Sequence, residues 1–259
     1  MELQDKVIIV TGAARGIGFA MCQRFAQEQP RAIVMADLKE SCVIESAAKL
    51  GAQSVACDVT IEDDVQRLVH ETLDQYGRVD LFCANAGVVD PGGIHASNEH
   101  WRRVMDVNFT SHLYSTRAVL PSMLARSAGC LLHTASAAGL LTSIGSASYA
   151  VSKHAAVAFA EWVAITYGDR GIQVACLCPQ GVETDMIKGD DPLSNMLRPH
   201  AVTPEKVAED VVVALREKRF LILPHAEVHR FTQNRATGHE RWLKGMQKIH
   251  RELMGDVEP

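Results

Sequence analysis

The sequence predicts an α/β fold in which a doubly wound, seven-stranded parallel sheet carries helices on both faces. Apolar, β-branched runs alternate with amphipathic stretches along the chain, the pattern of repeated strand–helix–strand units. The first apolar run leads directly into a glycine-rich turn. A length of 259 residues with 47% hydrophobic residues suits one large domain with an ordinary core. We therefore expect a single domain over residues 1–259.

The strands and helices can be placed in order along the chain. Strands are expected at 6–11, 32–37, 53–57, 79–84, 129–135, 172–178 and 219–223. Helices are expected at 16–28, 39–50, 61–76, 98–126, 147–168 and 204–217. Two helix starts carry capping signals: Thr60 with Asp63 forms a capping box, and Thr203 precedes a proline at the first helical position. The alternation implies right-handed crossovers between parallel strands.

The turn after the first strand contains three glycines in the pattern G-x-x-x-G-x-G. They are Gly12, Gly16 and Gly18, with Arg15 and Ile17 between them. Glycines let the backbone turn sharply and approach a pyrophosphate, and the start of the following helix offers free N–H groups and a positive dipole end. With a strand before it and a helix after it, this turn predicts a dinucleotide site in a Rossmann-type fold.

An acid at the end of the second strand bears on the choice of cofactor. Asp37, followed by Leu38, lies where a carboxylate accepts hydrogen bonds from the adenosine ribose hydroxyls and repels a 2′-phosphate. It therefore favours NAD over NADP. Arg15 favours the opposite choice, because a base in the glycine turn could contact a 2′-phosphate. A helix-capping role is the alternative for Asp37 that needs no ligand.

Small residues follow the fourth strand, and a catalytic pair follows the fifth. Asn85, Ala86 and Gly87 lie at the carboxyl end of a strand, where open α/β sheets bind ligands, although a tight connection would use similar residues. Tyr149 and Lys153 are four residues apart, so a helix would place them on one face. A nearby cation lowers the phenol pKa from about 10 toward a useful range for proton transfer.

Ser136 lies thirteen residues before the tyrosine and could hydrogen-bond the same substrate oxygen. Taken together, the motifs of this chain resemble those of the short-chain dehydrogenase/reductase family, from residue 5 to about 225. The matching segments in order are T-G-A-A-R-G-I-G, Asp58-Val59, A-N-A-G, Asn108, Ser136, Y-A-V-S-K and P-Q-G-V-E-T. The resemblance implies a catalytic tetrad of Asn108, Ser136, Tyr149 and Lys153.

The resemblance also implies cofactor contacts beyond the glycine turn. Asp58 and Val59 would hold the adenine, residues 85–87 would lie beside the cofactor, and Tyr149 and Lys153 would face the nicotinamide end. Pro179, Gly181, Val182 and Thr184 would surround the nicotinamide, with the last two on its carboxamide. Three positions depart from the family pattern, namely Ala84, Ala135 and Gln180, and the last of these stands where the family usually has glycine.

The expected substrate is a hydrophobic secondary alcohol of alicyclic, terpenoid or steroid-like type. In the segment 185–202, polar residues and prolines interrupt the apolar residues, a pattern that predicts a mobile lid. Residues 225–259 form a helical extension whose stripe of Trp242, Met246, Ile249 and Leu253 would pack onto the body or a partner subunit. Besides Ser136 and Tyr149, the candidate substrate contacts are Val88, Leu140, Leu141, Ile144, Gln180, Met186 and Ile187.

Composition excludes several other classes. The net charge of −5 argues against nucleic-acid binding, and no apolar run is long enough to predict a membrane span. Charged residues at the start lead straight into the first strand, and seven cysteines suggest reduced thiols, so a cytoplasmic location is expected. Cys176 and Cys178 are expected to be buried thiols, and no histidine has metal-ligand or triad spacing, so no metal is expected.

The leading hypothesis is an NAD-dependent dehydrogenase that interconverts a small hydrophobic alcohol and its ketone. Within the same class, the alternative is an NADPH-dependent ketone or 3-oxoacyl reductase, which Arg15 would favour. A non-catalytic, nucleotide-sensing regulator on the same scaffold is the alternative of another class, although such a protein would be expected to lack the tyrosine or lysine. The resemblance further implies a homotetramer built on the helices at 98–126 and 147–168.

Overall fold

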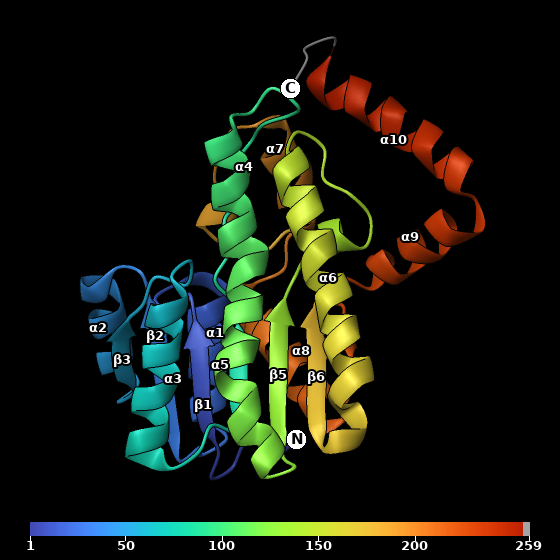
Figure 1. Cartoon of the computed structure of the whole chain (residues 1–259). Helices are drawn as coiled ribbons and strands as arrows, with labels where there is room; N and C mark the ends of the chain where they lie inside the picture. The colour runs from blue at the N-terminus through green and yellow to red at the C-terminus, as the bar shows by residue number, and fades with distance from the viewer. Residues whose placement is uncertain (256–259) are drawn as a thin grey trace.

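The computed structural model describes residues 1–255, and its centre is a seven-stranded sheet (Figure 1). All neighbouring strands are parallel, and their order is β3-β2-β1-β4-β5-β6-β7. The sheet is therefore doubly wound, with its order reversing between β1 and β4, as predicted. The strands are β1 Val7–Thr11, β2 Ala32–Asp37, β3 Gln53–Ala56, β4 Leu81–Ala84, β5 Gly129–Thr134, β6 Ile172–Leu177 and β7 Leu221–Ile222.

Helices cover both faces of the sheet, and each face has its own buried cluster. On one face, α1 (Gly16–Ala26), α2 (Glu40–Ala48) and α8 (Pro204–Arg216) pack side chains such as Phe25 and Val211 against Ile8 and Met35. On the other face, α3 (Glu62–Tyr76), α5 (Ser111–Ala125) and α6 (Ala147–Tyr167) pack against residues such as Ile9 and Phe82. Alternate residues of one strand thus enter opposite clusters, as a strand buried on both faces requires.

The long helix expected at 98–126 changes its helix type part of the way along. It consists of α4 (Asn98–Met105), a π-helical turn at Asp106–Thr110, and α5. A π turn carries one extra residue and commonly marks a functional position, and it is the turn that contains Asn108. The predicted helical segment is therefore present from 98 to 125 without a break, and only the π turn within it was not foreseen, because apolar periodicity does not reveal a single inserted residue.

Local signals at helix and strand ends had mixed outcomes. Thr203 caps α8 as predicted, accepting a hydrogen bond from the Lys206 N–H at 3.2 Å. The capping box at Thr60 is wrong: α3 begins at Glu62, and the Thr60 hydroxyl donates to Asp58 Oδ1 at 2.7 Å instead. The strand expected at 219–223 is reduced to the two residues of β7, because it lies at the open edge and pairs only with β6.

The remainder of the chain after β6 is built from short helices and an arm. Within the expected lid, 3₁₀ turns at Asp185–Ile187 and Arg198–His200 flank α7 (Pro192–Leu197). Two further helices, α9 (Ala226–Thr237) and α10 (His239–Met254), leave the body as an arm that rises beside α6 (Figure 1). The last four residues of the expected extension, 256–259, lie outside the described residues. No helix among residues 1–255 is both long and apolar enough to cross a bilayer.

Candidate active site

The glycine turn lies between the carboxyl end of β1 and the start of α1, at the edge where the strand order reverses. Gly12 and Gly16 have φ of 63° and 57°, in the left-handed region that favours glycine. A Cβ on Gly12 would lie 2.9 Å from the Ala86 Cα, and one on Gly18 would lie 2.2 Å from the Gly12 carbonyl oxygen. The turn therefore requires glycines for close backbone packing, and it leaves the α1 N-terminus open for an anionic ligand.

Asn85 joins three strands rather than projecting freely. Its Nδ2 donates to the Thr11 carbonyl at 3.0 Å, its Oδ1 accepts from the Thr134 hydroxyl at 3.1 Å, and its N–H donates to Thr11 Oγ1 at 3.0 Å. The carboxyl ends of β1, β4 and β5 are thereby tied together beside Ala86 and Gly87. Thr11 and Thr134 were absent from the predicted site, although both end strands whose next residues were predicted to bind ligands.

The candidate residues for the adenosine half occupy the ends of β2 and β3. Asp37 is partly buried, and its Oδ2 accepts a hydrogen bond from the Ala14 N–H at 3.0 Å, which orients the carboxylate toward the glycine turn. Leu38 is 65% exposed beside it. Asp58 is partly buried and Val59 is buried. The candidate base Arg15 is exposed, and its guanidinium lies 3.0 Å from Asp185 Oδ2 in an ion pair between the glycine turn and the expected lid.

Lys153 is buried within the fold, only 3% exposed. Its Nζ donates to the Thr134 carbonyl at 3.0 Å and lies 5.7 Å from the centre of the Tyr149 ring. Burial lowers the pKa of Lys153 to about 8, because an ammonium loses its hydration there. The predicted pairing on one face of α6 thus brings the amine and the phenol close together.

The electrostatics of Tyr149 differ from the expectation. Burial raises the pKa of Tyr149, and a hydrogen bond with Ser136 is the neighbouring effect that opposes the rise. We expected Lys153 to lower this pKa, but Lys153 is itself shifted toward its neutral form by burial. Ser136 is buried at the end of β5, and its Oγ donates to the Pro179 carbonyl at 3.4 Å. The hydroxyl groups of Ser136 and Tyr149 thus lie close to each other.

Asn108 is fully buried in the π turn and is held by three hydrogen bonds. Its Oδ1 accepts from the Val88 N–H at 2.8 Å, and its Nδ2 donates to the Val88 carbonyl at 2.9 Å and to Ser152 Oγ at 3.1 Å. The side chain therefore fastens the loop after β4 to α6. Ser152 was not among the predicted site residues, and its position next to Lys153 in the Y-A-V-S-K motif is the signal that could have found it.

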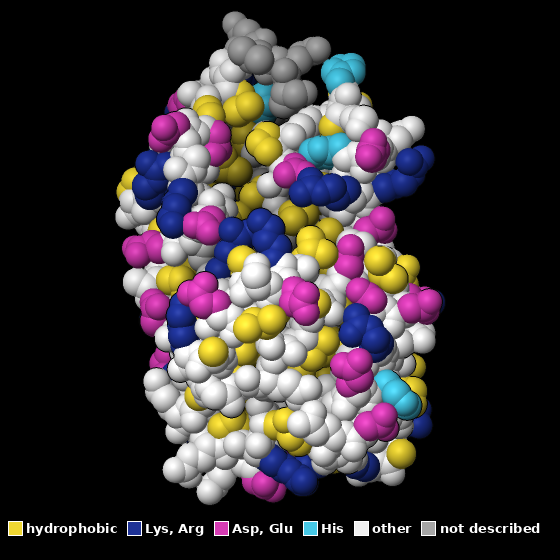
Figure 2. Space-filling view, turned by 90° about the vertical axis from the view of Figure 1, so that its left-hand side faces the viewer, with side chains coloured by type: hydrophobic (Ala, Val, Ile, Leu, Met, Phe, Trp, Pro, Cys, Tyr) yellow, Lys and Arg dark blue, Asp and Glu magenta, His cyan; other side chains and the backbone are white. Residues whose placement is uncertain are grey.

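The candidate substrate contacts come from three loops. Ile144 is buried, Val88, Leu140, Leu141, Gln180 and Ile187 are partly buried, and Met186 is 44% exposed. The loops after β4 and β5 are joined where the Gly92 N–H donates to the Gly145 carbonyl at 3.0 Å. In the nicotinamide segment, Pro179, Gly181 and Val182 are buried, and Thr184 is partly buried. The face in Figure 2 is hollowed in its upper half, with hydrophobic side chains along the walls.

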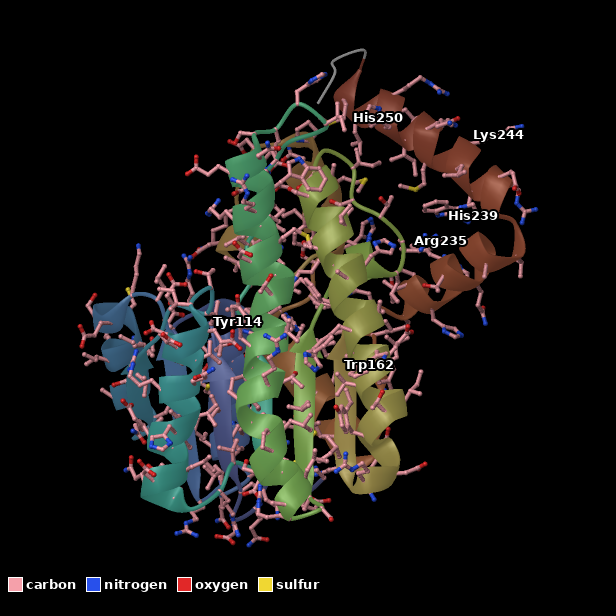
Figure 3. All side chains as sticks on the ribbon, in the orientation of Figure 1. Tyr114, Trp162, Arg235, His239, Lys244 and His250 are labelled. Atoms are coloured by element: carbon pink, nitrogen blue, oxygen red, sulfur yellow. The ribbon has the colours of Figure 1, made fainter. Side chains whose placement is uncertain are left out.

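The arm borders an open groove. This groove, of about 620 Å³, lies between α10, the loop 142–147 and the first turn of α6, with Leu243, Met246 and His250 on its α10 side. Ala147, Ala150 and Val151 line it, and these residues share the face of α6 that lies opposite Tyr149 and Lys153. Arg235 of α9 donates to the Leu140 carbonyl and stacks on Trp242, so the arm is anchored to the loop that follows Ser136 (Figure 3).

Neither the histidines nor the cysteines build a metal site. Among residues 1–255, no group of three or more His, Cys, Asp or Glu side chains could hold a metal ion. All seven cysteines are free thiols, and six are buried, with the Sγ atoms of Cys176 and Cys178 3.7 Å apart. His112 and His133 form a buried stacked pair whose Nδ1 atoms are 3.0 Å apart.

Comparison with known proteins gives a consistent result. The family model described as short chain dehydrogenase matches residues 6–192. A 1-deoxy-11-beta-hydroxypentalenate dehydrogenase of Streptomyces exfoliatus is 37% identical over 88% of this chain and 86% of its own length. A meso-2,3-butanediol dehydrogenase of Serratia marcescens is 33% identical over 73% of this chain and 76% of its own. A short chain dehydrogenase/reductase from Burkholderia phymatum, solved in complex with NAD, matches with a TM-score of 0.85 and 27% identity, covering 93% of this chain and 96% of its own.

Proposed function

Since the chain belongs to the short-chain dehydrogenase/reductase family and its relatives include dehydrogenases of a hydroxypentalenate and of a butanediol, we propose that it is an NAD-dependent dehydrogenase of hydrophobic secondary alcohols. The observation that carries the proposal is the group formed by three side chains: the buried Lys153 lies beside Tyr149, and Ser136 shares a hydrogen bond with the Tyr149 phenol. This group stands at the carboxyl edge of the sheet, next to the glycine turn.

The residues present fit a nicotinamide dinucleotide. Close backbone packing at Gly12 and Gly18 allows the tight turn that precedes the N-terminus of α1, and a Cβ on Gly87 would lie 3.4 Å from Lys153 Nζ. A bound nicotinamide would supply the acceptor or donor of the hydride at this edge of the sheet. Asp37 supports the choice of NAD, because its carboxylate is held at the glycine turn, where it would oppose a 2′-phosphate. Arg15 gives weaker support for NADP, since its guanidinium pairs with Asp185.

Each catalytic side chain has a defined task in this proposal. As a phenolate, Tyr149 takes the hydroxyl proton of the alcohol, and as a phenol it gives a proton to the ketone oxygen in the reverse direction. Ser136 positions the substrate oxygen by donating a hydrogen bond to it. Lys153 holds the ribose beside the nicotinamide, and its pKa of about 8 lets it carry a charge near neutral pH. Asn108 keeps the loop after β4 fixed against α6.

The substrate class rests on the apolar loops and on the relatives. Leu140, Leu141, Ile144 and Val88 supply apolar surface above the sheet, and the segment 185–202 would close over it as a lid. The relatives include dehydrogenases of a hydroxypentalenate, of a butanediol and of borneol. A hydrophobic secondary alcohol fits both observations. We also propose that the protein is a homotetramer in the cytoplasm. An interface between subunits is supported by two exposed apolar side chains of α6, Trp162 and Ile165, which are 56% and 84% exposed.

The experiment that tests the proposal compares kcat/KM for NAD and NADP on a panel of hydrophobic secondary alcohols. We expect NAD to be preferred by about tenfold or more, equivalent to about 1.4 kcal/mol. Asp37→Asn should narrow this preference, whereas Asp63→Asn, an exposed carboxylate on α3, should leave it unchanged. A preference of the wild-type protein for NADP would contradict our interpretation of Asp37 and favour the reductase alternative.

A further inference from the structure

Gln180 carries a buried polar atom that the protein itself does not satisfy. It lies in the turn after β6, at the position where the family usually has glycine. Its Oε1 is shielded from solvent and has no hydrogen-bond donor among the residues that the structure describes. A buried acceptor without a partner destabilises the folded state, so such an atom in a native protein calls for an explanation. A donor supplied by a bound molecule would remove this cost.

The position of Gln180 places it next to the catalytic serine. The preceding residue, Pro179, accepts hydrogen bonds at its carbonyl from the Ala137 N–H at 2.8 Å and from Ser136 Oγ at 3.4 Å. Gln180 therefore begins one peptide unit away from the group that contacts the Ser136 hydroxyl. Its long side chain is rooted at the reacting end of the site and not at the adenosine end.

The backbone around Gln180 is held by a buried histidine. His225, 4% exposed at the start of α9, accepts a hydrogen bond from the Gln180 N–H at Nδ1 (3.2 Å) and donates from Nε2 to the Gly181 carbonyl at 3.0 Å. These two bonds define one neutral tautomer of the ring. The Gly181 carbonyl also accepts from the Val202 N–H at 3.1 Å. These hydrogen bonds fix the backbone position from which the Gln180 side chain extends.

We propose that Gln180 is a specificity-determining residue whose amide oxygen accepts a hydrogen bond from a second hydroxyl group of the substrate. The inference rests on the proposed function. The reacting alcohol has one O–H proton, which passes to Tyr149, so it has none left for Gln180. The donor must therefore be a different group of the bound ligand. The preferred substrate class is then a diol or hydroxyketone on an apolar frame rather than a simple monoalcohol.

One relative is named for a vicinal diol, meso-2,3-butanediol, and another for borneol, which has a single hydroxyl, so the substrate class rests on Gln180 itself. Sites that hydrogen-bond a substrate hydroxyl discriminate strongly against the analogue that lacks it, since a buried polar group is then left unpaired. A hydrophobic pocket alone could not make this distinction, because it gains nothing from an added hydroxyl. Gln180 thus supplies a selectivity that the apolar loops lack.

The test measures kcat/KM for matched pairs of substrates, namely 2-butanol with 2,3-butanediol and cyclohexanol with trans-1,2-cyclohexanediol. The wild-type enzyme should prefer the diol by about tenfold or more in at least one pair, as one hydrogen bond of about 1.4 kcal/mol predicts. Gln180→Met, which keeps the length and removes the acceptor, should bring that ratio close to one. Gln66→Met, an exposed glutamine on α3, should keep the wild-type ratio.

The other outcomes distinguish a substrate hydroxyl from the nicotinamide as the hydrogen-bond donor to Gln180. A diol ratio that is the same in the wild-type protein and in Gln180→Met would overturn the inference. So would a Gln180→Met variant that binds NAD at least about tenfold more weakly, since the amide oxygen would then serve the nicotinamide. Turnover of alcohols without any diol preference would overturn this inference alone. Absence of turnover for every alcohol tested would overturn the proposed function, and this inference with it.

Discussion

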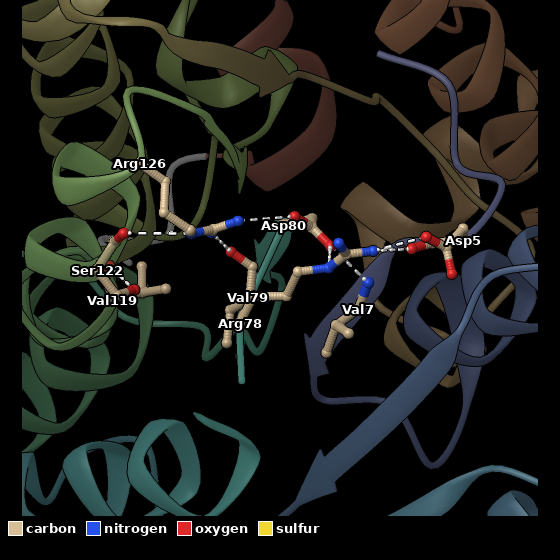
Figure 4. Close-up of polar contacts among 8 residues, drawn as sticks. All are labelled: Asp5, Val7, Arg78, Val79, Asp80, Val119, Ser122 and Arg126. Atoms are coloured by element: carbon tan, nitrogen blue, oxygen red, sulfur yellow. Dashed lines mark hydrogen bonds and ion pairs between the residues drawn. The ribbon is translucent and has the colours of Figure 1, made fainter. Parts of the chain in front are cut away.

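The two ends of the central strands bury charge in opposite ways. Before β4, Asp80 is 7% exposed and accepts hydrogen bonds from the Val7 N–H at 2.9 Å and from Arg126 Nη1 at 3.0 Å. Arg78 Nε adds an ion pair with the same carboxylate at 2.9 Å (Figure 4). Lys153, on α6 beyond the carboxyl end of β5, is similarly buried, yet it donates to a neutral carbonyl, and no carboxylate among the described residues influences its pKa.

The difference between Asp80 and Lys153 shows which end of the sheet serves stability and which serves catalysis. A carboxylate with two guanidinium groups and an amide is electrically compensated, so it joins β1, β4 and α5 at little cost in desolvation. The lysine at the other end has no compensating charge, and its lowered pKa records that cost. Strongly shifted groups of this kind gather at functional sites. The carboxyl end of the sheet is thus the end that gives up stability for reactivity.

The largest effect should come from removing the phenol oxygen at the reactive end. Tyr149→Phe should lower kcat by about 10²–10⁴-fold, because proton transfer loses its donor and acceptor while the ring is kept. The affinity for NAD and the midpoint of thermal unfolding should change little. Steady-state rates, NAD titration and a melting curve measure the three quantities. A loss of NAD affinity as large as the loss in kcat would contradict the assigned role.

A smaller effect, of another kind, is expected at the opposite end. Asp80→Asn should lower the free energy of unfolding by about 3 kcal/mol, because it leaves two guanidinium groups without their carboxylate. Both arginines are about 30% exposed, which keeps the cost at the lower end of the usual range. Activity per folded molecule should be preserved. Urea unfolding and kcat at low temperature test both statements.

The matched control for this variant is Asp5→Asn. Asp5 also pairs with Arg78, at 2.9 Å, but its side chain is 73% exposed. An exposed pair contributes about 0.2–1 kcal/mol, so this variant should be close to wild type in urea. Equal destabilisation by the two substitutions would mean that burial of Asp80 has no special weight.

The sequence predicted the sheet more completely than the contacts at its ends. Runs such as residues 7–10 and 32–36 are apolar throughout, and a strand covered on both faces has that composition. The Arg126–Asp80 pair joins residues 46 positions apart, so no local pattern indicates it. The same reason hides the bond between Asn85 and Thr134. The π turn at Asn108 and the false cap at Thr60 show the converse, since one inserted residue or one competing acceptor overrules a local signal.

The candidate site was predictable where a motif fixes both residue type and spacing. Tyr149 and Lys153 meet because α6 is helical, and the glycine turn lies where the first strand delivers it. The electrostatic roles were not predictable, because they depend on burial. Lys153 was expected as a cation acting on the phenol, whereas burial shifts both groups toward their neutral forms. Likewise, the unpaired oxygen of Gln180 follows from packing and not from any motif.

The smallest expected effect concerns the pH dependence of stability at the reactive end. The pKa of Lys153 is about 8 in the folded protein and 10.5 in an unperturbed lysine, so the unfolded chain binds more protons between these values. Its free energy of unfolding therefore rises with pH through this window, by about 2 kcal/mol between pH 7.5 and 9.5. Lys153→Met should lack this rise. The comparison requires urea unfolding of both proteins at each pH without cofactor.

Other buried groups change stability over the same range, so the difference between the two proteins is the meaningful quantity. Burial raises the pKa of Cys57 and Cys130 to about 12. Because the unfolded thiols ionise first, these groups lower the free energy of unfolding as pH rises above the pKa of a free thiol. Both cysteines are present in the wild-type protein and in Lys153→Met, so their contribution cancels. If the difference in unfolding free energy did not change with pH, Lys153 would be fully charged or compensated in the folded protein. The reactive end would then be as well balanced as the Asp80 end, and the contrast between the two ends of the sheet would be lost.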